Sequence, residues 1–255
     1  MEKDIAARKA KTLKNLLSLA RPILLDECPL PTGLRVAVLG PHPDDFDAIA
    51  VTLRHFRDAG NGISVAVLSG GASGVEDGYC EPPTDDRKVE LRRLEQRASC
   101  RMFGLPDDAL EFLPLSEDVD GEPDNTPANA EILLNHLTQI RPDIVFLPHG
   151  NDQKPGHRNV YALVQQAAAR HPSPLVAFLN RDPKTVSCRL DAFTRYGEDD
   201  ARWKAQLLRC HDSQQQRNLN TRGHGFDERI LEHDRKNAAD CGGATYAEAF
   251  EIEMA

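Results

Sequence analysis

The chain has 255 residues and a formal net charge of -9 at pH 7. This acidic balance excludes nucleic acid as the main partner, because binding a phosphate backbone requires a basic surface. No apolar run approaches the roughly 18 residues of a membrane span, and the six cysteines show no CxxC pair that would indicate a disulfide framework or zinc ribbon. We expect a cytoplasmic protein without a membrane partner, and the sequence leaves a monomer and a homo-oligomer equally open.

Residues 1–30 predict a helical extension that precedes a main domain over residues 31–255. Basic residues and leucines are interleaved in the first twenty positions, in a pattern typical of an amphipathic helix. The segment lacks the apolar stretch of about seven residues that characterises a secretory signal. We therefore expect this part of the chain to stay with the protein as a helix.

From residue 34 onward, apolar runs of strand length alternate with helical patterns. We predict strands over Leu34–Leu39, Ile63–Leu68, Leu110–Leu113, Ile144–Leu147 and Leu175–Leu179, and helices over Ala48–Ala59, Asp86–Phe103, Ala128–Ile140 and His157–Arg170. After Arg181 the pattern weakens to two short helices, over 203–210 and 228–239, with a polar loop between them. The alternation indicates βαβ units around a parallel sheet, and a single α/β domain.

The segment His42-Pro-Asp44-Asp45 directly follows the first predicted strand. Ligands and catalytic groups collect at the carboxyl edge of a parallel sheet. In one interpretation an aspartate only caps the next helix, which begins near Phe46, and His42 is an ordinary loop residue. In the other, His42 and Asp45 chelate a divalent metal, and Asp44 removes a proton from the attacking water.

A second polar segment follows another apolar run, which ends at Pro148. It contains His157, the best candidate for a third metal ligand, and His149, which competes for that role or contacts the substrate. Asp152 is placed to accept the outer N–H of a ligand histidine. Two histidines and one carboxylate suit Zn²⁺, although Fe²⁺ uses the same set of ligands.

Five motifs resemble those of the PIG-L/LmbE-like zinc-dependent N-deacetylases. The family motif AHPDDE stands here as PHPDDF, and PND-x-HPDH stands as HGNDQKPGH. The other matches are an RxxE helix ending in LG, an HxSQ and a YAExF, which correspond to Arg92–Glu95 with Phe103-Gly104, His211–Gln214 and Tyr246–Phe250. The resemblance runs from about Arg35 to Phe250, so it covers nearly the whole chain.

The resemblance implies a Rossmann-like, three-layer α/β fold with a mostly parallel sheet. It also implies hydrolysis of an N-acyl group, typically an acetyl group on an amino sugar. Carried over by position, His42, Asp45 and His157 would bind Zn²⁺, and Asp44 would be the general base.

Two departures from the family pattern stand out. Phe46 replaces the glutamate that closes the first motif, and Asp47 follows one position too late, so we expect a supporting hydrogen bond to be lost. In the second motif, Lys154 replaces a histidine and Gly156 replaces an aspartate. Lys154 either supplies positive charge to an oxyanion, as a catalytic residue, or points to solvent.

Other segments are candidates for substrate contacts. Arg92 and Glu95 form either an i, i+3 pair on a solvated face or a brace for the site. Ser73 belongs to a glycine-rich loop that follows the second strand, where backbone N–H groups can approach a ligand. The acidic segments 76–86 and 116–125 are predicted to be mobile loops that shape the pocket.

These observations lead to one main functional hypothesis, a metal-dependent hydrolase that removes an N-acetyl group from an amino sugar or related small molecule. The alternatives are a metal-dependent amidase of a non-sugar amide and a catalytically decayed metal-binding module. A dehydrogenase is disfavoured, because His42-Pro43 stands where a dinucleotide fold requires its glycine fingerprint.

Overall fold

An eight-stranded sheet forms the middle layer of the computed structural model, which describes residues 2–254, with side chains from Ala10 onward. The strand order is β1-β7-β8-β6-β5-β2-β3-β4, and β8 alone runs antiparallel to its neighbours. The strands are β1 (Ile23–Leu24), β2 (Arg35–Gly40), β3 (Gly62–Val67), β4 (Leu110–Phe112), β5 (Ile144–Pro148), β6 (Val176–Asn180), β7 (Ala192–Tyr196) and β8 (Tyr246–Met254).

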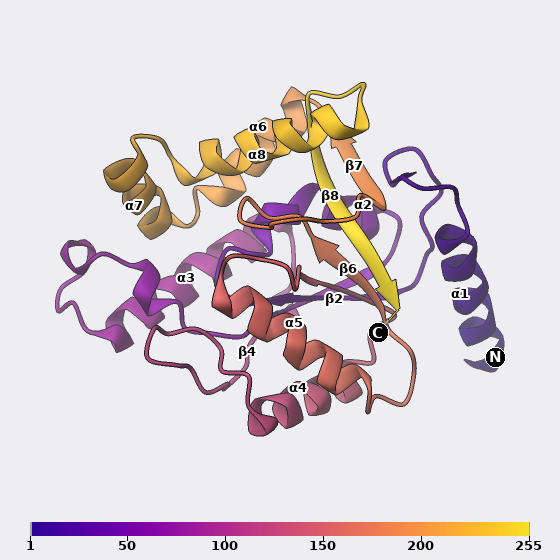
Figure 1. Cartoon of the computed structure of the whole chain (residues 1–255), viewed down its shortest axis with the longest axis horizontal. Coiled ribbons are helices and arrows are strands. Elements are labelled where there is room, and N and C mark those ends of the chain that lie inside the picture. The colour runs from indigo at the N-terminus through magenta and orange to yellow at the C-terminus, as the bar shows by residue number, and fades with distance from the viewer. Residues whose placement is uncertain (1, 255) are drawn as a thin grey trace.

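Helices cover both faces of this sheet, with α4 and α5 side by side at one end and α6 to α8 near the other (Figure 1). Helix α1 and helix α7 lie at opposite ends of the long axis (Figure 1). The helices are α1 (Glu2–Leu17), α2 (Ala50–Asp58), α3 (Asp85–Phe103), α4 (Pro127–Ile140), α5 (Pro155–Ala168), α6 (Glu198–Leu208), α7 (Asp212–Arg222) and α8 (Phe226–Cys241). Short 3-10 turns occupy Asp47–Ile49, Ala72–Gly74, Asp77–Tyr79 and Asp107–Ala109.

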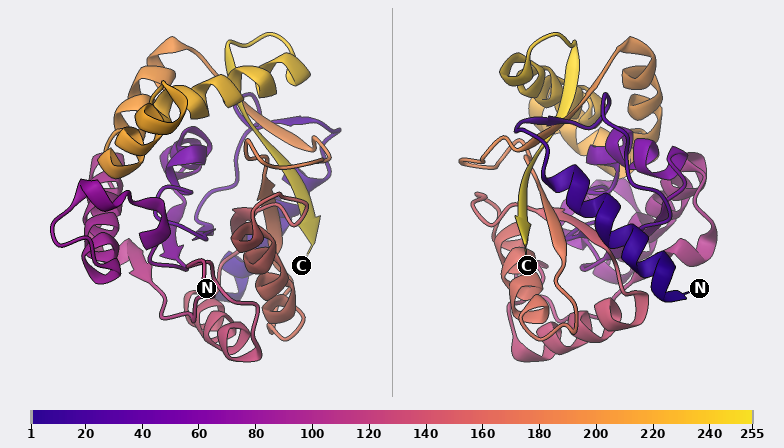
Figure 2. Two further views of the ribbon diagram at one scale, coloured as in Figure 1. Left: turned by 60° about the vertical axis from the view of Figure 1, so that its left-hand side comes forward. Right: turned by 90° about the vertical axis from the view of Figure 1, so that its right-hand side faces the viewer.

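The central strands are buried on both faces, which explains their unbroken apolar sequences. In β2, Val36 and Val38 pack with α1, α2 and α3, whereas Ala37 and Leu39 face α4 and α5. Successive side chains of a strand point to opposite faces, so one short apolar run supplies two cores. The result is the predicted three-layer α/β fold with a mostly parallel sheet, in one domain (Figure 2).

The five predicted strands and the predicted helices are all present, with ends shifted by a few residues. Three elements were missed, β7, β8 and α7, together with the two-residue strand β1. The prediction of a polar loop after residue 210 was wrong, because α7 fills most of it. This helix is polar on all sides, and hydrogen bonds rather than an apolar stripe hold it: the Ser213 N–H and hydroxyl both donate to Glu95 at 2.7 Å.

The strand order reverses at β2, which has β3 on one side and β5 on the other. Such a switch point opens a crevice at the carboxyl ends of the two diverging strands. The chain leaves β2 at Gly40 and β5 at Pro148, directly before the two polar segments. Within residues 2–254, no helix has the length and apolarity required to cross a membrane.

Candidate active site

The loop after β2 folds back on itself before the first helical turn begins. The His42 N–H donates to Asp45 Oδ2 at 2.7 Å, and the Asp44 N–H donates to Gln96 Oε1 at 2.9 Å. Asp44 has a φ of +118°, a conformation that residues with a Cβ rarely adopt. Backbone strain of this kind costs about 1–3 kcal/mol and concentrates at functional sites, where surrounding contacts enforce it.

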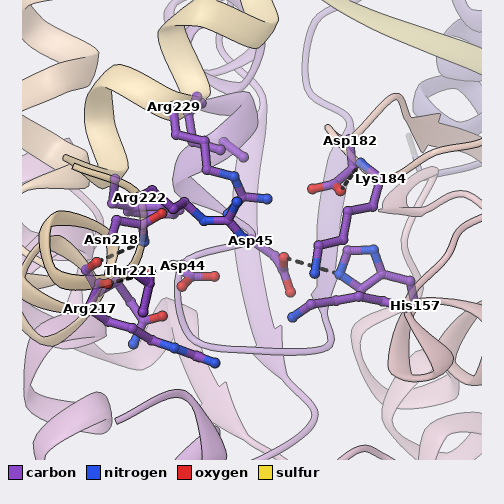
Figure 3. A pocket seen from close by; sticks show the side chains of 15 residues that line it. Asp44, Asp45, His157, Asp182, Lys184, Arg217, Asn218, Thr221, Arg222 and Arg229 are labelled. Atoms are coloured by element: carbon purple, nitrogen blue, oxygen red, sulfur yellow. Dashed lines mark hydrogen bonds and ion pairs between the residues drawn. The ribbon is translucent and has the colours of Figure 1, made fainter. Parts of the chain in front are cut away.

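His42, Asp45 and His157 come together at the switch point. Asp45 Oδ2 lies 3.5 Å from His42 Nδ1, and Asp45 Oδ1 lies 3.7 Å from His157 Nε2. One ligand atom from each side chain can be chosen so that all lie within 4.8 Å of one another. His42 and Asp45 come from the β2 loop, whereas His157 lies in the first turn of α5, so the fold joins two distant segments. Asp45 and His157 face each other across the cleft (Figure 3).

The outer nitrogens of both histidines face carboxylates. His42 Nε2 lies 2.8 Å from Glu122 Oε2, and His157 Nδ1 lies 3.4 Å from Asp152 Oδ2. Each imidazole thus turns one nitrogen toward Asp45 and the other toward a second acid, the arrangement that orients histidine ligands in metal sites. The donor set therefore fits a divalent ion such as Zn²⁺ or Fe²⁺.

The charges at this site reinforce one another. Burial and the nearby Lys154 ammonium lower the pKa of His42, but hydrogen bonds to Asp45 and Glu122 outweigh them and raise it to about 9. Burial alone would raise the pKa of Asp45, yet its contacts with His42 and the charge of His157 hold that pKa well below its usual range. The cluster strongly favours an ionised Asp45, which is the form that binds cations.

Asp44 is held by a buried arginine. Arg92, on α3, is only 2% exposed and donates to Asp44 Oδ2 at 2.8 Å and to the Pro43 carbonyl oxygen. Arg92 Nη1 lies 3.5 Å from Glu95 Oε2, and Glu95 in turn accepts the two hydrogen bonds from Ser213. The Arg92–Glu95 pair is therefore a brace behind the site and not a pair on a solvated face.

Asp47 is hydrogen-bonded to side chains of α3 and to His211. This fully buried carboxylate accepts from Ser99 Oγ at 2.6 Å and lies 2.6 Å from His211 Nε2. Phe46 points into the core, where its ring packs edge-on against Phe103 at 5.0 Å. The expected loss of a supporting hydrogen bond is thus not seen, because the bend after Asp44 turns Asp47 toward α3 and His211.

Comparison with known proteins is consistent with this arrangement. Residues 37–168, more than half of the chain, match the PIG-L family, described as GlcNAc-PI de-N-acetylase. The chain belongs to the PIG-L family. The match includes both polar segments and therefore all three residues of the proposed metal site.

Solved structures show the same fold at low sequence identity. N,N'-diacetylchitobiose deacetylase from Pyrococcus horikoshii aligns with a TM-score of 0.74 and 19% identity, over 96% of this chain and 91% of that one. Protein TT1542 from Thermus thermophilus has a TM-score of 0.63 and 22% identity, over 85% and 93% of the chains. The hydratase GalB from Pseudomonas putida aligns with a TM-score of 0.64 and 18% identity, over 86% of this chain and 95% of that one. No curated protein sequence matches the chain significantly.

Gly156, one of the two departures in the second motif, lies beside a carboxylate from another segment. Gly156 leaves room for the Glu122 carboxylate, which a Cβ at position 156 would clash with. Glu122 comes from the segment 116–125, so a carboxylate from a distant part of the chain occupies the space beside Gly156. Glu122 was not predicted as a site residue, because nothing local to that acidic segment indicates that it reaches His42.

Lys154 lines the cleft and does not simply point to solvent, which was the alternative to a catalytic role. It is half-buried at the N-terminus of α5 and contributes to both parts of the cleft, one toward α7 and α8 and one toward Ser73 and Glu122. Asp152 Oδ1 accepts the Lys154 N–H at 2.7 Å, which fixes the backbone there. Ser73 lines the second part of the cleft with Gly74.

His149 lies apart from the other two histidines. Its Nδ1 accepts the Asn151 N–H at 2.9 Å, and its Nε2 lies 3.1 Å from Glu251 on β8. The residues that line the cleft do not include it. The structure therefore gathers His157, and not His149, with His42 and Asp45.

Proposed function

We propose that this PIG-L family member is a metal-dependent hydrolase that removes an N-acetyl or other N-acyl group from an amino sugar or a related small molecule. One observation carries the proposal: His42, Asp45 and His157 converge at the switch point of the sheet, with Asp44 beside them in the same cleft. Zn²⁺ or Fe²⁺ would be the cofactor, and a small N-acylated molecule the substrate.

A divalent ion held by these three side chains supplies Lewis acidity toward water and toward an acyl carbonyl. Asp44 accepts the proton of the attacking water and passes it toward the amine that leaves. Arg92 holds the Asp44 carboxylate in place throughout. The Lys154 ammonium lies at the cleft, where positive charge stabilises the oxyanion of a tetrahedral intermediate. Cleavage yields a free amine and a carboxylate.

Two of the comparisons support a deacetylase over other reactions on this fold. The family description names an N-acetyl substrate, and the structure from Pyrococcus horikoshii is named as a deacetylase of an amino sugar. GalB, with a similar fold, is named as a hydratase. Because one fold hosts both reactions, the substrate must be established by assay.

The first experiment measures the metal content of the purified protein by elemental analysis, together with acetate release from a panel of N-acetylated sugars and non-sugar amides. The double variant His42→Ala/His157→Ala is the matched comparison. We expect about one zinc or iron per wild-type chain, loss of the metal in the variant, and acetate release from an amino sugar only by the wild type.

Each other outcome selects a different function. Metal binding with release only from non-sugar amides would favour an amidase. Metal binding without hydrolysis of any amide would favour the decayed module or a hydratase. A wild-type protein that takes up no metal after reconstitution would refute the proposal.

A further inference from the structure

The cleft extends beyond the proposed metal site into a cavity of about 270 Å³ that is bounded by α7 and α8. Arg217 and Arg222 on α7 and Arg229 on α8 line it, and Lys184 faces them from the loop after β6. Figure 3 shows the three arginine side chains converging on the space in front of Asp44 and Asp45. We call Arg217, Arg222, Arg229 and Lys184 the cationic wall.

The cationic wall gathers four positive side chains in one cavity, and among the described residues none of them forms an ion pair with a carboxylate. Within the described part of the chain, none of its four side chains, and not Lys154 either, forms an ion pair or a hydrogen bond. Most arginines elsewhere in the described part of the chain form ion pairs with carboxylates, as in Arg54–Asp200, Arg101–Asp107 and Arg181–Asp240. Unpaired cations that crowd one cavity repel one another, and an anionic ligand relieves that repulsion.

The acids of the cavity do not neutralise the wall. Asp44 is paired with Arg92, and Asp45 lies between two histidines. Asp182 Oδ1 accepts the backbone N–H of Lys184 at 2.9 Å. Burial and the charges of Lys154, Arg229 and Arg222 lower the pKa of Lys184, although Asp182 opposes this effect, so excess positive charge surrounds the ammonium. This positive cavity belongs to a chain with a net charge of -9.

A buried amide adds a second feature. Asn218 is 6% exposed and lines the same cavity, where its Nδ2 donates to the Gln214 carbonyl at 2.8 Å. Its Oδ1 is buried and has no partner in the protein. A buried acceptor is costly to leave unsatisfied, and a hydroxyl group of a ligand in the cavity would satisfy it.

We propose that the cationic wall is a subsite for an anionic group, a phosphate or a carboxylate, on a hydroxyl-bearing substrate whose N-acyl group lies at Asp44. Arginine guanidiniums bind both groups through paired, charge-assisted hydrogen bonds. The inference rests on the proposed function for the position of the acyl group, but anion binding is independent of it. The subsite selects acidic conjugates over neutral N-acetyl sugars.

Binding is tested first, on the metal-loaded full-length protein, by calorimetric titration with inorganic phosphate and with citrate at low ionic strength. The test variant is Arg217→Gln/Arg222→Gln, and the matched control is Arg202→Gln, an exposed arginine on α6 outside the cavity. We expect the double variant to bind at least one of the two anions about tenfold more weakly or worse, with its metal content unchanged. The control should bind like the wild type.

Turnover is tested next with N-acetylglucosamine, N-acetylglucosamine 6-phosphate and N-acetylmuramic acid, which are neutral, phosphorylated and carboxylated. We expect the wild type to have a kcat/KM at least tenfold higher for one acidic substrate, and the double variant to lose that preference. The two acidic substrates distinguish phosphate from carboxylate recognition.

The binding and turnover results separate the two proposals. Equal anion affinity in the wild type and the double variant refutes the subsite, whatever the turnover. Arginine-dependent anion binding without acetate release from any substrate supports the subsite and counts against the deacetylase. Acetate release with equal kcat/KM for neutral and acidic substrates supports the deacetylase and refutes the substrate selection.

Discussion

At the scale of single residues, the site is built from contacts between a few chemically matched side chains. Gly156 and Glu122 are one such match, because the absence of a side chain at one position admits the carboxylate of the other. Asp44 and Arg92 are another, since the buried guanidinium fixes a carboxylate whose backbone is itself strained. Substitutions at these positions therefore separate the roles of metal binding and proton transfer.

Asp44→Asn keeps a hydrogen-bond acceptor for Arg92 but removes the proposed general base. We expect kcat to fall by about 10²–10⁴-fold, the usual contribution of a general base, while the metal content stays at the wild-type level. Metal analysis and steady-state acetate release on the same preparation check this. His157→Ala, in contrast, should lose the metal. An Asp44→Asn enzyme with wild-type kcat would show that another group removes the proton.

Glu122→Gln should lower zinc affinity by about tenfold or more, because carboxylates that orient histidine ligands typically contribute that much. Gly156→Ala should have a similar effect, since the new methyl group must displace the flexible end of Glu122. The zinc affinity of the double variant Glu122→Gln/Gly156→Ala should be no lower than that of the single variant that binds zinc less tightly, because both changes remove the same contact. Competition with a chromogenic chelator measures the affinity.

Gly78→Ala is the control for that experiment, because a Cβ at position 78 meets open space. Its zinc affinity should equal that of the wild type. Additive losses in Glu122→Gln/Gly156→Ala would mean that the two residues act on the metal site separately.

At the scale of elements, polar contacts attach segments that apolar packing does not. Helix α7 is attached through Ser213 to Glu95 and through Gln214 to the Gly74 carbonyl, and it carries two arginines of the cationic wall. Elsewhere in the sheet, Asp191 joins β1, β7 and β8. It pairs with Arg21 and Arg189, and Oδ2 accepts the Ile252 N–H at 2.9 Å.

Asp191 makes stability depend on pH in acid. Burial raises its pKa, but Arg189, the Ile252 N–H and Arg21 together hold it below the ordinary value. The unfolded chain therefore binds the proton more tightly, so this contribution is present above about pH 4 and is lost as the pH falls through the folded-state pKa. We expect Asp191→Asn to be less stable than the wild type by about 1–3 kcal/mol at pH 7, and the difference to shrink at pH 3.

Urea denaturation at both pH values measures the difference. Asp107→Asn serves as the control, because Asp107 also pairs with an arginine but is largely exposed, and solvent screening should leave its removal without effect at either pH. If Asp191→Asn changes the unfolding free energy by the same amount at pH 7 and pH 3, the ionised Asp191 carboxylate is not the source of the pH dependence.

At the scale of the whole molecule, a buried cluster of charged side chains connects the loop that carries Asp45 to α6, α8 and β8. Lys204 on α6 is fully buried and donates to Asp234 on α8 at 2.6 Å and to Glu248 on β8 at 2.7 Å. It also donates to the Ala48 carbonyl, three residues after Asp45. Glu248 in turn accepts from the Thr52 N–H at the start of α2. One ammonium group thus links four elements around the proposed metal site.

Lys204→Met should destabilise the protein by about 3–5 kcal/mol, because it leaves two buried carboxylates without their cation. Urea denaturation at pH 7 measures the change, with Lys236→Met as the control. Lys236 is on α8 and pairs with Glu232, but both side chains are mostly exposed, so we expect no measurable effect. A wild-type unfolding free energy for Lys204→Met would show that the cluster contributes little.

The sequence by itself determined the central strands, the helices between them and the two polar segments at the switch point. Strands buried on both faces are continuous apolar runs, and parallel strands end at one edge, so residues 42–45 and 149–157 could be placed together without coordinates. These patterns are local in the chain, so they can be recognised without knowledge of how the elements pack.

Only the tertiary structure decided which distant groups meet. Strand β8 contains three glutamates and was not predicted, because their partners, among them Lys204 and His149, lie 44 or more residues away. Helix α7, the contact between Glu122 and His42, and the convergence of the cationic wall were not predicted for the same reason, because their partners are distant in the sequence. A buried charge is costly until a partner satisfies it, and a sequence shows the charge but not the partner.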